Sequence, residues 1–195
     1  MQKKIQKPRP APARREQPAG VYLIHGENEL AVTDQAREII QRLIPASAEA
    51  LSLEVIPAQA GNVAEALECI DQCRAAIQTV SLLGGPKAVW LRNASFLDQG
   101  LIGKSRAVRE RLQTLADILS SGLPADQLLV ITSPKVDAAS AFFKACQAAG
   151  QVLEFKLGKP WQRDKPAADF AAQAFRKLGL NISGSVLQAF MLKVG

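Results

Sequence analysis

The sequence lacks an uncharged apolar run that approaches the roughly 18 residues of a membrane span. Its first residues are rich in Lys, Arg, Pro and Ala and no apolar stretch follows them, so we expect no secretory signal. With 48% hydrophobic residues in 195, the chain can still bury a sizeable core. These features predict a cytoplasmic protein without a membrane partner.

Ligands for a metal ion are also scarce. The chain has one histidine, His25, and three cysteines, of which Cys69 and Cys73 are four apart on a predicted helix while Cys146 is distant. No Cys-x-x-Cys pair occurs, and a structural zinc site needs about four ligands. We therefore expect the cysteines to be small core residues, and we expect no metal and no cofactor.

The positive charge is concentrated at one end of the chain. The formal net charge is +6, and residues 1–16 hold six basic side chains against the single acid Glu16, which leaves the rest close to neutral. We interpret residues 1–19 as a disordered, basic, Pro-rich arm. The alternative is an arm that contacts DNA phosphates and releases their counterions.

The pattern that follows predicts a strand, a glycine turn and a helix, which is the geometry of a phosphate-binding loop. The apolar run 21–25 is typical of a central parallel strand. A working loop reads Gly-x-x-x-x-Gly-Lys-Ser/Thr, because backbone N–H groups wrap the phosphates and a lysine meets their charge. Here Ala31 replaces the second glycine and Val32 replaces the lysine, so only Gly26 and Thr33 match.

Two further features argue against nucleotide chemistry. Glu27 and Glu29 add negative charge where a polyphosphate would sit, and the strand 87–91 ends in Arg92-Asn93. An ATPase strand of this kind ends in Asp-Glu, whose carboxylates help to hold Mg²⁺ and polarise the attacking water. We therefore predict a degenerate nucleotide site that does not bind ATP, formed by Gly26, Ala31, Val32, Thr33, Arg92 and Asn93.

The remaining pattern alternates strands with helices. We predict strands over 51–56, 128–132 and 152–155 and helices over 62–79, 105–121 and 138–149. This alternation favours a three-layer α/β fold with a parallel sheet and right-handed crossovers. A linker follows, and then two helical patterns over 167–178 and 183–193. We divide the chain into the arm 1–19, an α/β domain 20–157, and a linker with the start of a truncated helical second domain, 158–195.

Two surface features have competing interpretations. Leu82 and Leu83 precede Gly84-Gly85-Pro86, where a helix must end and a strand begin. They either cap a core or project as an apolar plug for a groove on another protein. Lys104, Arg106, Arg109 and Arg111 surround the start of the helix 105–121, against its macrodipole. They either form a solvated face or meet DNA or an acidic partner.

The segment around the leucine pair carries a resemblance. Gln78-x-x-Ser81-Leu82-Leu83 resembles the Gln-x-x-Ser/Asp-Leu-Phe/Leu sliding-clamp-binding motif of bacterial replication proteins, at the place where the delta subunit family of the DNA polymerase III clamp loader carries it. Three other segments match that family in order, namely 22–29, 129–135 and 179–182. From residue 21 onward, the chain is similar to the N-terminal part of that family.

The resemblance implies an AAA+ fold without ATPase activity in a subunit of the DNA-directed DNA polymerase (nucleotidyltransferase) holoenzyme. Such a subunit acts in DNA replication by binding and opening the sliding clamp (beta subunit), with other clamp-loader subunits as partners and DNA contacted indirectly or weakly. The implied clamp-binding residues are Gln78, Val80, Ser81, Leu82 and Leu83. Leu83 stands where phenylalanine is common, and we expect the collar-forming domain to lie outside this chain. Two alternatives stay open: a divergent P-loop NTPase and a nucleic-acid-binding adaptor.

Overall fold

The computed structural model describes residues 20–44, 52–79, 81, 85–124, 126–156, 175, 180 and 182–194. Its centre is a five-stranded parallel sheet with the strand order β2-β3-β4-β1-β5. The strands are β1 Val21–His25, β2 Leu53–Pro57, β3 Lys87–Arg92, β4 Gln127–Ser133 and β5 Gln151–Glu154. All five predicted strands are therefore present.

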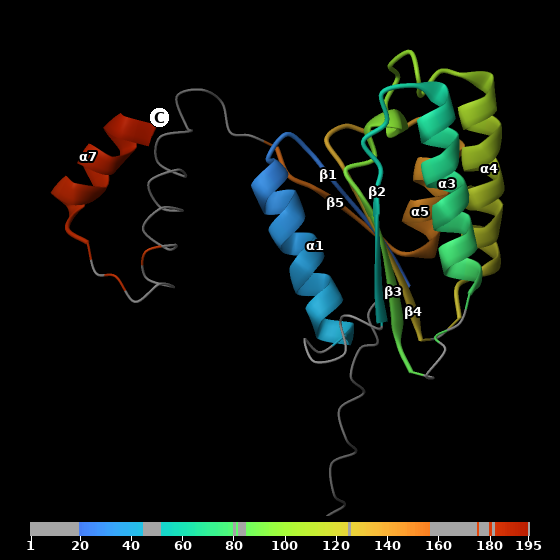
Figure 1. Ribbon diagram of the computed structural model, residues 1–195, viewed down its shortest axis with the longest axis horizontal. Helices are drawn as coiled ribbons and strands as arrows, with labels where there is room; N and C mark the ends of the chain where they lie inside the picture. Colours follow the sequence, from blue (N-terminus) through green and yellow to red (C-terminus); the bar gives the residue numbers. More distant parts are fainter. Residues whose placement is uncertain are drawn as a thin grey trace, which may run out of the picture.

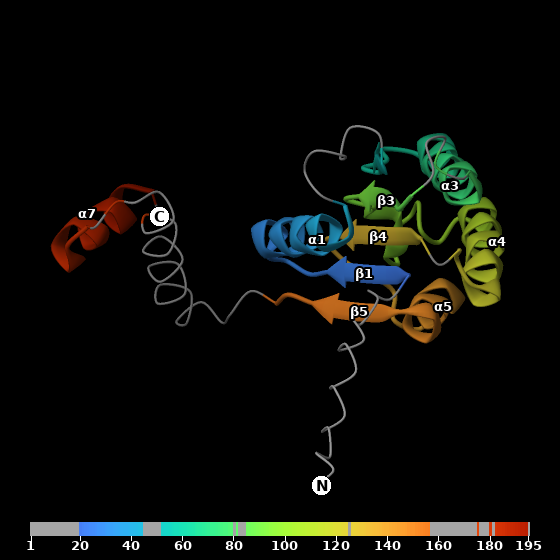
Figure 2. The same cartoon turned by 90° about the horizontal axis from the view of Figure 1, so that it is seen from below.

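Helices cover both faces of the sheet. One face packs against α1 Glu29–Leu43, and the other against α3 Val63–Gln78, α4 Arg106–Ser121 and α5 Ala141–Ala149 (Figures 1 and 2). A short 3₁₀ helix, η2 Ser95–Leu97, follows β3, and α7 Gly184–Val194 lies near the end of the chain. The predicted three-layer α/β fold is confirmed.

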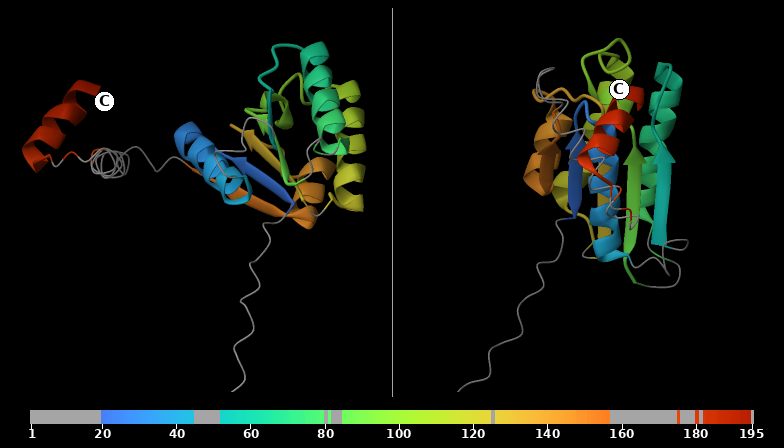
Figure 3. Two further views of the ribbon diagram at one scale, coloured as in Figure 1. Left: turned by 60° about the horizontal axis from the view of Figure 1, so that its bottom comes forward. Right: turned by 90° about the vertical axis from the view of Figure 1, so that its left-hand side faces the viewer.

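Alternation along the strands sends side chains into two separate cores. In β1, Val21 and Leu23 join the core under α3, α4 and α5, whereas Tyr22 and Ile24 join the core under α1. The side view in Figure 3 shows the sheet between these layers. Burial on both faces explains why the central strands are continuous apolar runs.

Local sequence signals set most helix boundaries. The helix predicted over 62–79 is α3, and Asn62 is its cap, since the Asn62 side chain accepts a hydrogen bond from the Glu65 N–H at 3.0 Å. Helix α5 begins at Ala141, three residues later than predicted, because Ser140 is its cap and accepts from the Phe143 N–H. Pro57, one residue beyond the predicted strand 51–56, is the last residue of β2, and β2 is an edge strand, which tolerates a missing N–H group.

The cysteines lie in the core, as predicted. Cys73 and Cys146 are buried, and Cys69, which is partly buried, donates to the Pro57 carbonyl. His25 packs edge-on against Phe143, and burial lowers its pKa more than Glu154 raises it. Within the described ranges, no group of three metal-ligating side chains occurs and no helix is long and apolar enough to cross a membrane.

Three of the predictions fall on other parts of the chain. The basic arm 1–19 and the linker after residue 157 lie outside the described residues, as does nearly all of the predicted helix 167–178. The helix predicted from Ser183 is observed as α7, with Ser183 Oγ 3.5 Å from the Val186 N–H nitrogen. The division of the chain into domains stays a prediction.

Candidate functional site: a cleft at the strand ends and the end of α3

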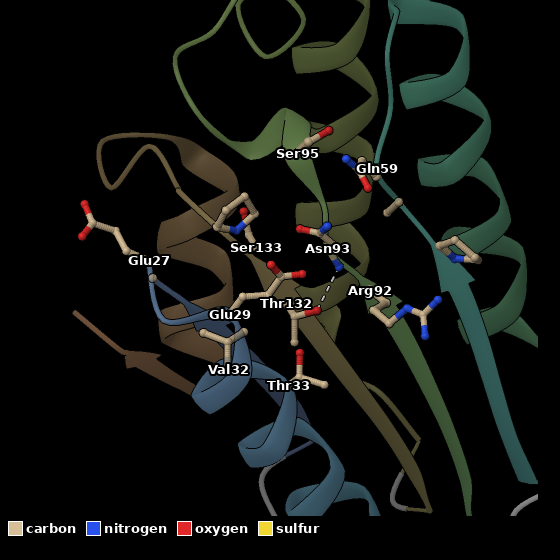
Figure 4. Close-up of a pocket in the computed structure, with 14 residues that line it drawn as sticks. Glu27, Glu29, Val32, Thr33, Gln59, Arg92, Asn93, Ser95, Thr132 and Ser133 are labelled. Atoms are coloured by element: carbon tan, nitrogen blue, oxygen red, sulfur yellow. Dashed lines mark hydrogen bonds between the residues drawn. The ribbon is translucent and has the colours of Figure 1, made fainter. Parts of the chain in front are cut away.

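A cleft of about 570 Å³ lies at the carboxyl ends of the strands, where ligands of open α/β sheets bind. Five residues of the predicted degenerate site line it together: Gly26, Val32, Thr33, Arg92 and Asn93. The sixth, Ala31, is not among the lining residues, and its N–H donates to Asn28 Oδ1 at 3.1 Å. Figure 4 shows Val32 and Thr33 on α1 facing the ends of β3 and β4 across this cleft.

Backbone N–H groups of the loop between β1 and α1 are used within the protein. The Gly26 N–H donates to the Ser133 carbonyl at 3.1 Å, and the Asn28 N–H donates to the Phe155 carbonyl at 3.4 Å. Together with the Ala31 amide in the first turn of α1, three amides of this strand-to-helix connection have internal acceptors. A phosphate-binding loop instead aims such groups at its ligand.

Gly26 has a structural role in the same loop. Its φ of +140° is a conformation that residues with a Cβ rarely adopt, and a Cβ at this position would stand 2.1 Å from the Phe155 carbonyl oxygen. The Phe155 N–H in turn donates to the His25 carbonyl at 2.8 Å. The glycine therefore allows the chain that follows β5 to pass directly against this loop.

The polar side chains at the ends of β3 and β4 hold these two strand ends together. Thr132 Oγ1 accepts from the Asn93 N–H at 2.9 Å (Figure 4). It also accepts from Trp90 Nε1 at 3.2 Å. Ser133 Oγ lies 2.8 Å from each of the Ala94 and Lys135 carbonyl oxygens. The Ser133 hydroxyl is therefore engaged by the backbone.

The charges in the cleft are mixed. Glu27 and Glu29 line it together with one cation, Arg92, whose guanidinium lies over the Trp90 ring at 5.9 Å. Figure 4 shows Glu27 turned away from the other labelled side chains. Two carboxylates and a single arginine among the lining residues give the cleft an unfavourable charge balance for a polyphosphate.

The second predicted site begins at the end of α3. Gln78 is the last residue of that helix and is exposed, while Ser81 is partly buried. Val80, Leu82 and Leu83 lie outside the described residues. The capping residue Thr79 donates its N–H to the Ala75 carbonyl and its hydroxyl to the Ala76 carbonyl.

Sequence reasoning missed a lysine at the same place. Lys87 opens β3, and its ammonium group donates to the Ala76 carbonyl and to Thr79 Oγ1, both at 2.7 Å. The same group pairs with Glu54 at 3.1 Å. The only signal in the sequence is a lysine that begins an otherwise apolar strand.

Two of the cations at the start of α4 have acidic partners. Arg111 forms an ion pair with Asp71 of α3, and Arg106 pairs with Glu110 at 2.7 Å. Arg109 lines a smaller cleft of about 370 Å³ that also contains Asp98 and Asp137. We expected these cations to form a solvated face or to meet DNA or an acidic partner. For Arg111 the partner is Asp71 of the same chain, and their ion pair joins α4 to α3.

The fold of this chain is similar to those of known proteins. Curated proteins give no match to the sequence. Among solved structures, the fold is similar to the Bacillus subtilis DNA clamp loader delta protein, with 16% identity and a TM-score of 0.58. It is also similar to a chain of the HORMA:CdnC:Trip13 complex of E. coli MS115-1, with 15% identity and a TM-score of 0.50.

Because the sequence identities are only 16% and 15%, these structural matches show the fold alone. They cover 90% of this chain in both cases, and 48% and 59% of the respective matched chains, so the chain spans about half the length of the B. subtilis protein. The family model described as DNA polymerase III, delta subunit matches residues 22–156, from β1 to just beyond β5. The chain therefore belongs to the delta subunit family of DNA polymerase III.

Proposed function

We propose that this chain is a delta-type clamp-loader subunit that binds and opens the sliding clamp during DNA replication. The observation that carries the proposal is the family match over residues 22–156, which includes the whole segment from Gln78 to Leu83. The B. subtilis protein of similar fold is itself named a clamp loader delta protein. In this role the chain works in the cytoplasm with the other subunits of the loader.

The proposed contact with the clamp is an apolar plug. Leu82 and Leu83 enter an apolar pocket on the clamp, and Gln78 hydrogen-bonds at the rim of that pocket. Burial of two leucines is worth roughly 3–6 kcal/mol before ordering costs. The exposure of Gln78 at the end of α3 supports this arrangement. Opening of the ring uses further contacts from the same face.

The proposed role includes no ATPase activity of its own. The internal hydrogen bonds of the Gly26 and Asn28 amides and the replacement of the acidic strand end by Arg92 support this view. ATP is hydrolysed by other subunits of the loader. Contact with DNA is weak or indirect, and the acidic partners of Arg106 and Arg111 reduce the positive charge available for it.

The test is the double substitution Leu82→Ala/Leu83→Ala, assayed for binding to the cognate sliding clamp. We expect clamp affinity to fall by several kcal/mol, on the order of 100-fold or more, with little change in the free energy of unfolding. The matched control is Leu101→Ala, which removes a leucine side chain that is 95% exposed elsewhere on the domain. This control should bind the clamp as the unchanged chain does.

Two other results would contradict the proposal. If the leucines fill a core, each substitution opens a cavity and costs about 2–5 kcal/mol of stability, and the folded variant still binds the clamp. If the chain is a nucleic-acid adaptor, it binds DNA with a salt-dependent affinity that survives the loss of both leucines.

A further inference from the structure

A cluster of polar side chains lies at the base of the proposed clamp-contact segment, outside the motif itself. Its centre is Lys87, whose side chain is only 11% exposed. The Lys87 ammonium group donates to the Ala76 carbonyl, to Thr79 Oγ1 and, at 3.4 Å, to the Thr79 carbonyl. These acceptors form the last turn and cap of α3. A cation at this end of a helix also opposes the negative pole of the macrodipole.

Gln127 holds the same helix end from a second strand. It is the first residue of β4, is 8% exposed, and donates from Nε2 to the Thr79 carbonyl at 3.1 Å. Its Oε1 is buried and has no hydrogen-bond partner among the described residues. The Thr79 carbonyl therefore receives donors from both β3 and β4, which are neighbouring strands of the sheet.

Burial of the polar groups of Lys87 and Gln127 has a cost in folding free energy. An ammonium group taken out of water is favourable only when its donors are matched, and an apolar side chain serves stability as well at many such places. A buried glutamine oxygen without a partner is likewise a cost to folding. Lys87 and Gln127 both donate to the Thr79 carbonyl despite this cost, and their bonds hold the last turn of α3 in one orientation.

Thr79 and Lys87 lie at the two ends of the segment that connects α3 to β3. Thr79 caps α3 and Lys87 starts β3, so their contact closes the chain between them at its base. Gln78, the first residue of the motif, is directly attached to this closed base. We propose that Lys87, assisted by Gln127, is a positioning residue for the clamp contact. This inference rests on the proposed function.

The benefit of such positioning is entropic. A segment whose ends are already held loses less conformational freedom when it binds, so more of the contact energy appears as affinity. Removal of the Lys87 contacts should therefore weaken clamp binding without touching any residue that meets the clamp.

The principal variant is Lys87→Met, which keeps the length of the side chain and removes its donors. We expect clamp affinity to fall about tenfold, equivalent to about 1.4 kcal/mol, at a temperature where the variant is fully folded. Amide hydrogen exchange of residues 78–85 should become faster in the same variant without the clamp. Lys144→Met is the matched control, because Lys144 is exposed on α5 and the charge change is identical.

Gln127→Leu separates positioning from stability. It removes the bond to the Thr79 carbonyl together with the unpartnered Oε1, so we expect unchanged or higher stability and a clamp affinity that is about threefold lower. A purely structural role would move stability and affinity in the same direction. This variant also keeps the test decisive if Lys87→Met does not fold.

A free peptide of residues 77–85 completes the experiment. We expect it to bind the clamp more weakly than the intact chain, and the affinity of Lys87→Met to lie closer to that of the peptide. Equal affinity of the peptide and the chain, or unchanged clamp affinity in both variants, overturns the inference alone. Failure of the unchanged chain to bind the clamp overturns the proposed function and this inference with it.

Discussion

At the scale of single residues, Gly26 shows how a familiar pattern can serve a different purpose. A glycine after the first strand matches the beginning of a phosphate-binding loop. Here its N–H bonds to the Ser133 carbonyl, and its missing side chain makes room for the Phe155 carbonyl. The glycine is required by the packing of the backbone whether or not a nucleotide binds.

Gly26→Ala should therefore destabilise the domain by about 2–4 kcal/mol, from backbone strain of about 1–3 kcal/mol and from the clash with Phe155. Urea-induced unfolding measures this cost. Gly122→Ala is the matched control, since Gly122 also has a positive φ, of 90°, but a Cβ there meets nothing within 4 Å. Similar costs for the two variants would show that strain alone, and not the Phe155 contact, requires Gly26.

At the scale of elements, α3, α4 and α5 form one layer that is held by both ionic and apolar contacts. The Arg111–Asp71 pair joins α4 to α3. Cys73 of α3 and Cys146 of α5 are part of the core beneath these helices. Because this layer includes α3, its packing also sets the place of the helix end that carries Gln78.

The two buried thiols predict a loss of stability at alkaline pH. Burial raises the pKa of Cys73 and of Cys146 from the ordinary 9.0 to about 12, with smaller contributions from Glu54 and from Cys73 respectively. Above pH 9 the unfolded chain loses these protons while the folded chain keeps them. The free energy of unfolding should therefore fall as the pH rises, by at most about 1.4 kcal/mol per pH unit for each thiol.

Urea unfolding at pH 8, 9 and 10 measures this slope. The comparison is Cys73→Ala/Cys146→Ala, which should be less stable at pH 8 because of the lost packing but should show a shallower decline. Identical slopes for the two proteins would assign the alkaline loss to other groups.

At the scale of the whole molecule, the fold retains the cleft of a nucleotide-binding domain with a different set of groups around it. The family match shows the relationship to the delta subunit family of DNA polymerase III, and the structure has a cleft at the carboxyl ends of a parallel sheet. The described residues that flank the proposed clamp-contact segment, Gln78 at the end of α3 and Lys87 at the start of β3, lie toward the opposite ends of the strands. Neither of these two residues lines the cleft.

The purified chain should show no saturable, Mg²⁺-dependent ATP binding and no ATP hydrolysis. Val32→Lys alone should not restore them, because Arg92 still stands where a carboxylate would help to hold the metal and the Gly26 and Asn28 amides remain bonded internally. Calorimetric titration with ATP, with and without Mg²⁺, measures binding. Saturable binding that depends on Mg²⁺ in the unchanged chain would contradict the prediction.

The sequence by itself determined the elements of this protein. The apolar runs gave five strands, Asn62 marked the start of α3, and the absence of the lysine at Val32 was visible by simple comparison. These features are local, because periodicity, capping and motif spacing involve residues within a turn or two of each other. The family resemblance rests on the same short-range patterns, and the family match confirms it.

Only the tertiary structure decided which distant groups meet. Thr132 accepts from Trp90 and the Asn93 backbone about forty positions earlier in the chain, and Arg111 pairs with Asp71 at a similar separation. Lys87 meets the last turn of α3 because the folded chain brings the start of β3 beside that end of the helix. A burial pattern states that a side chain is inside but not which neighbour it meets, because partners are set by the order of the strands and the packing of the helices.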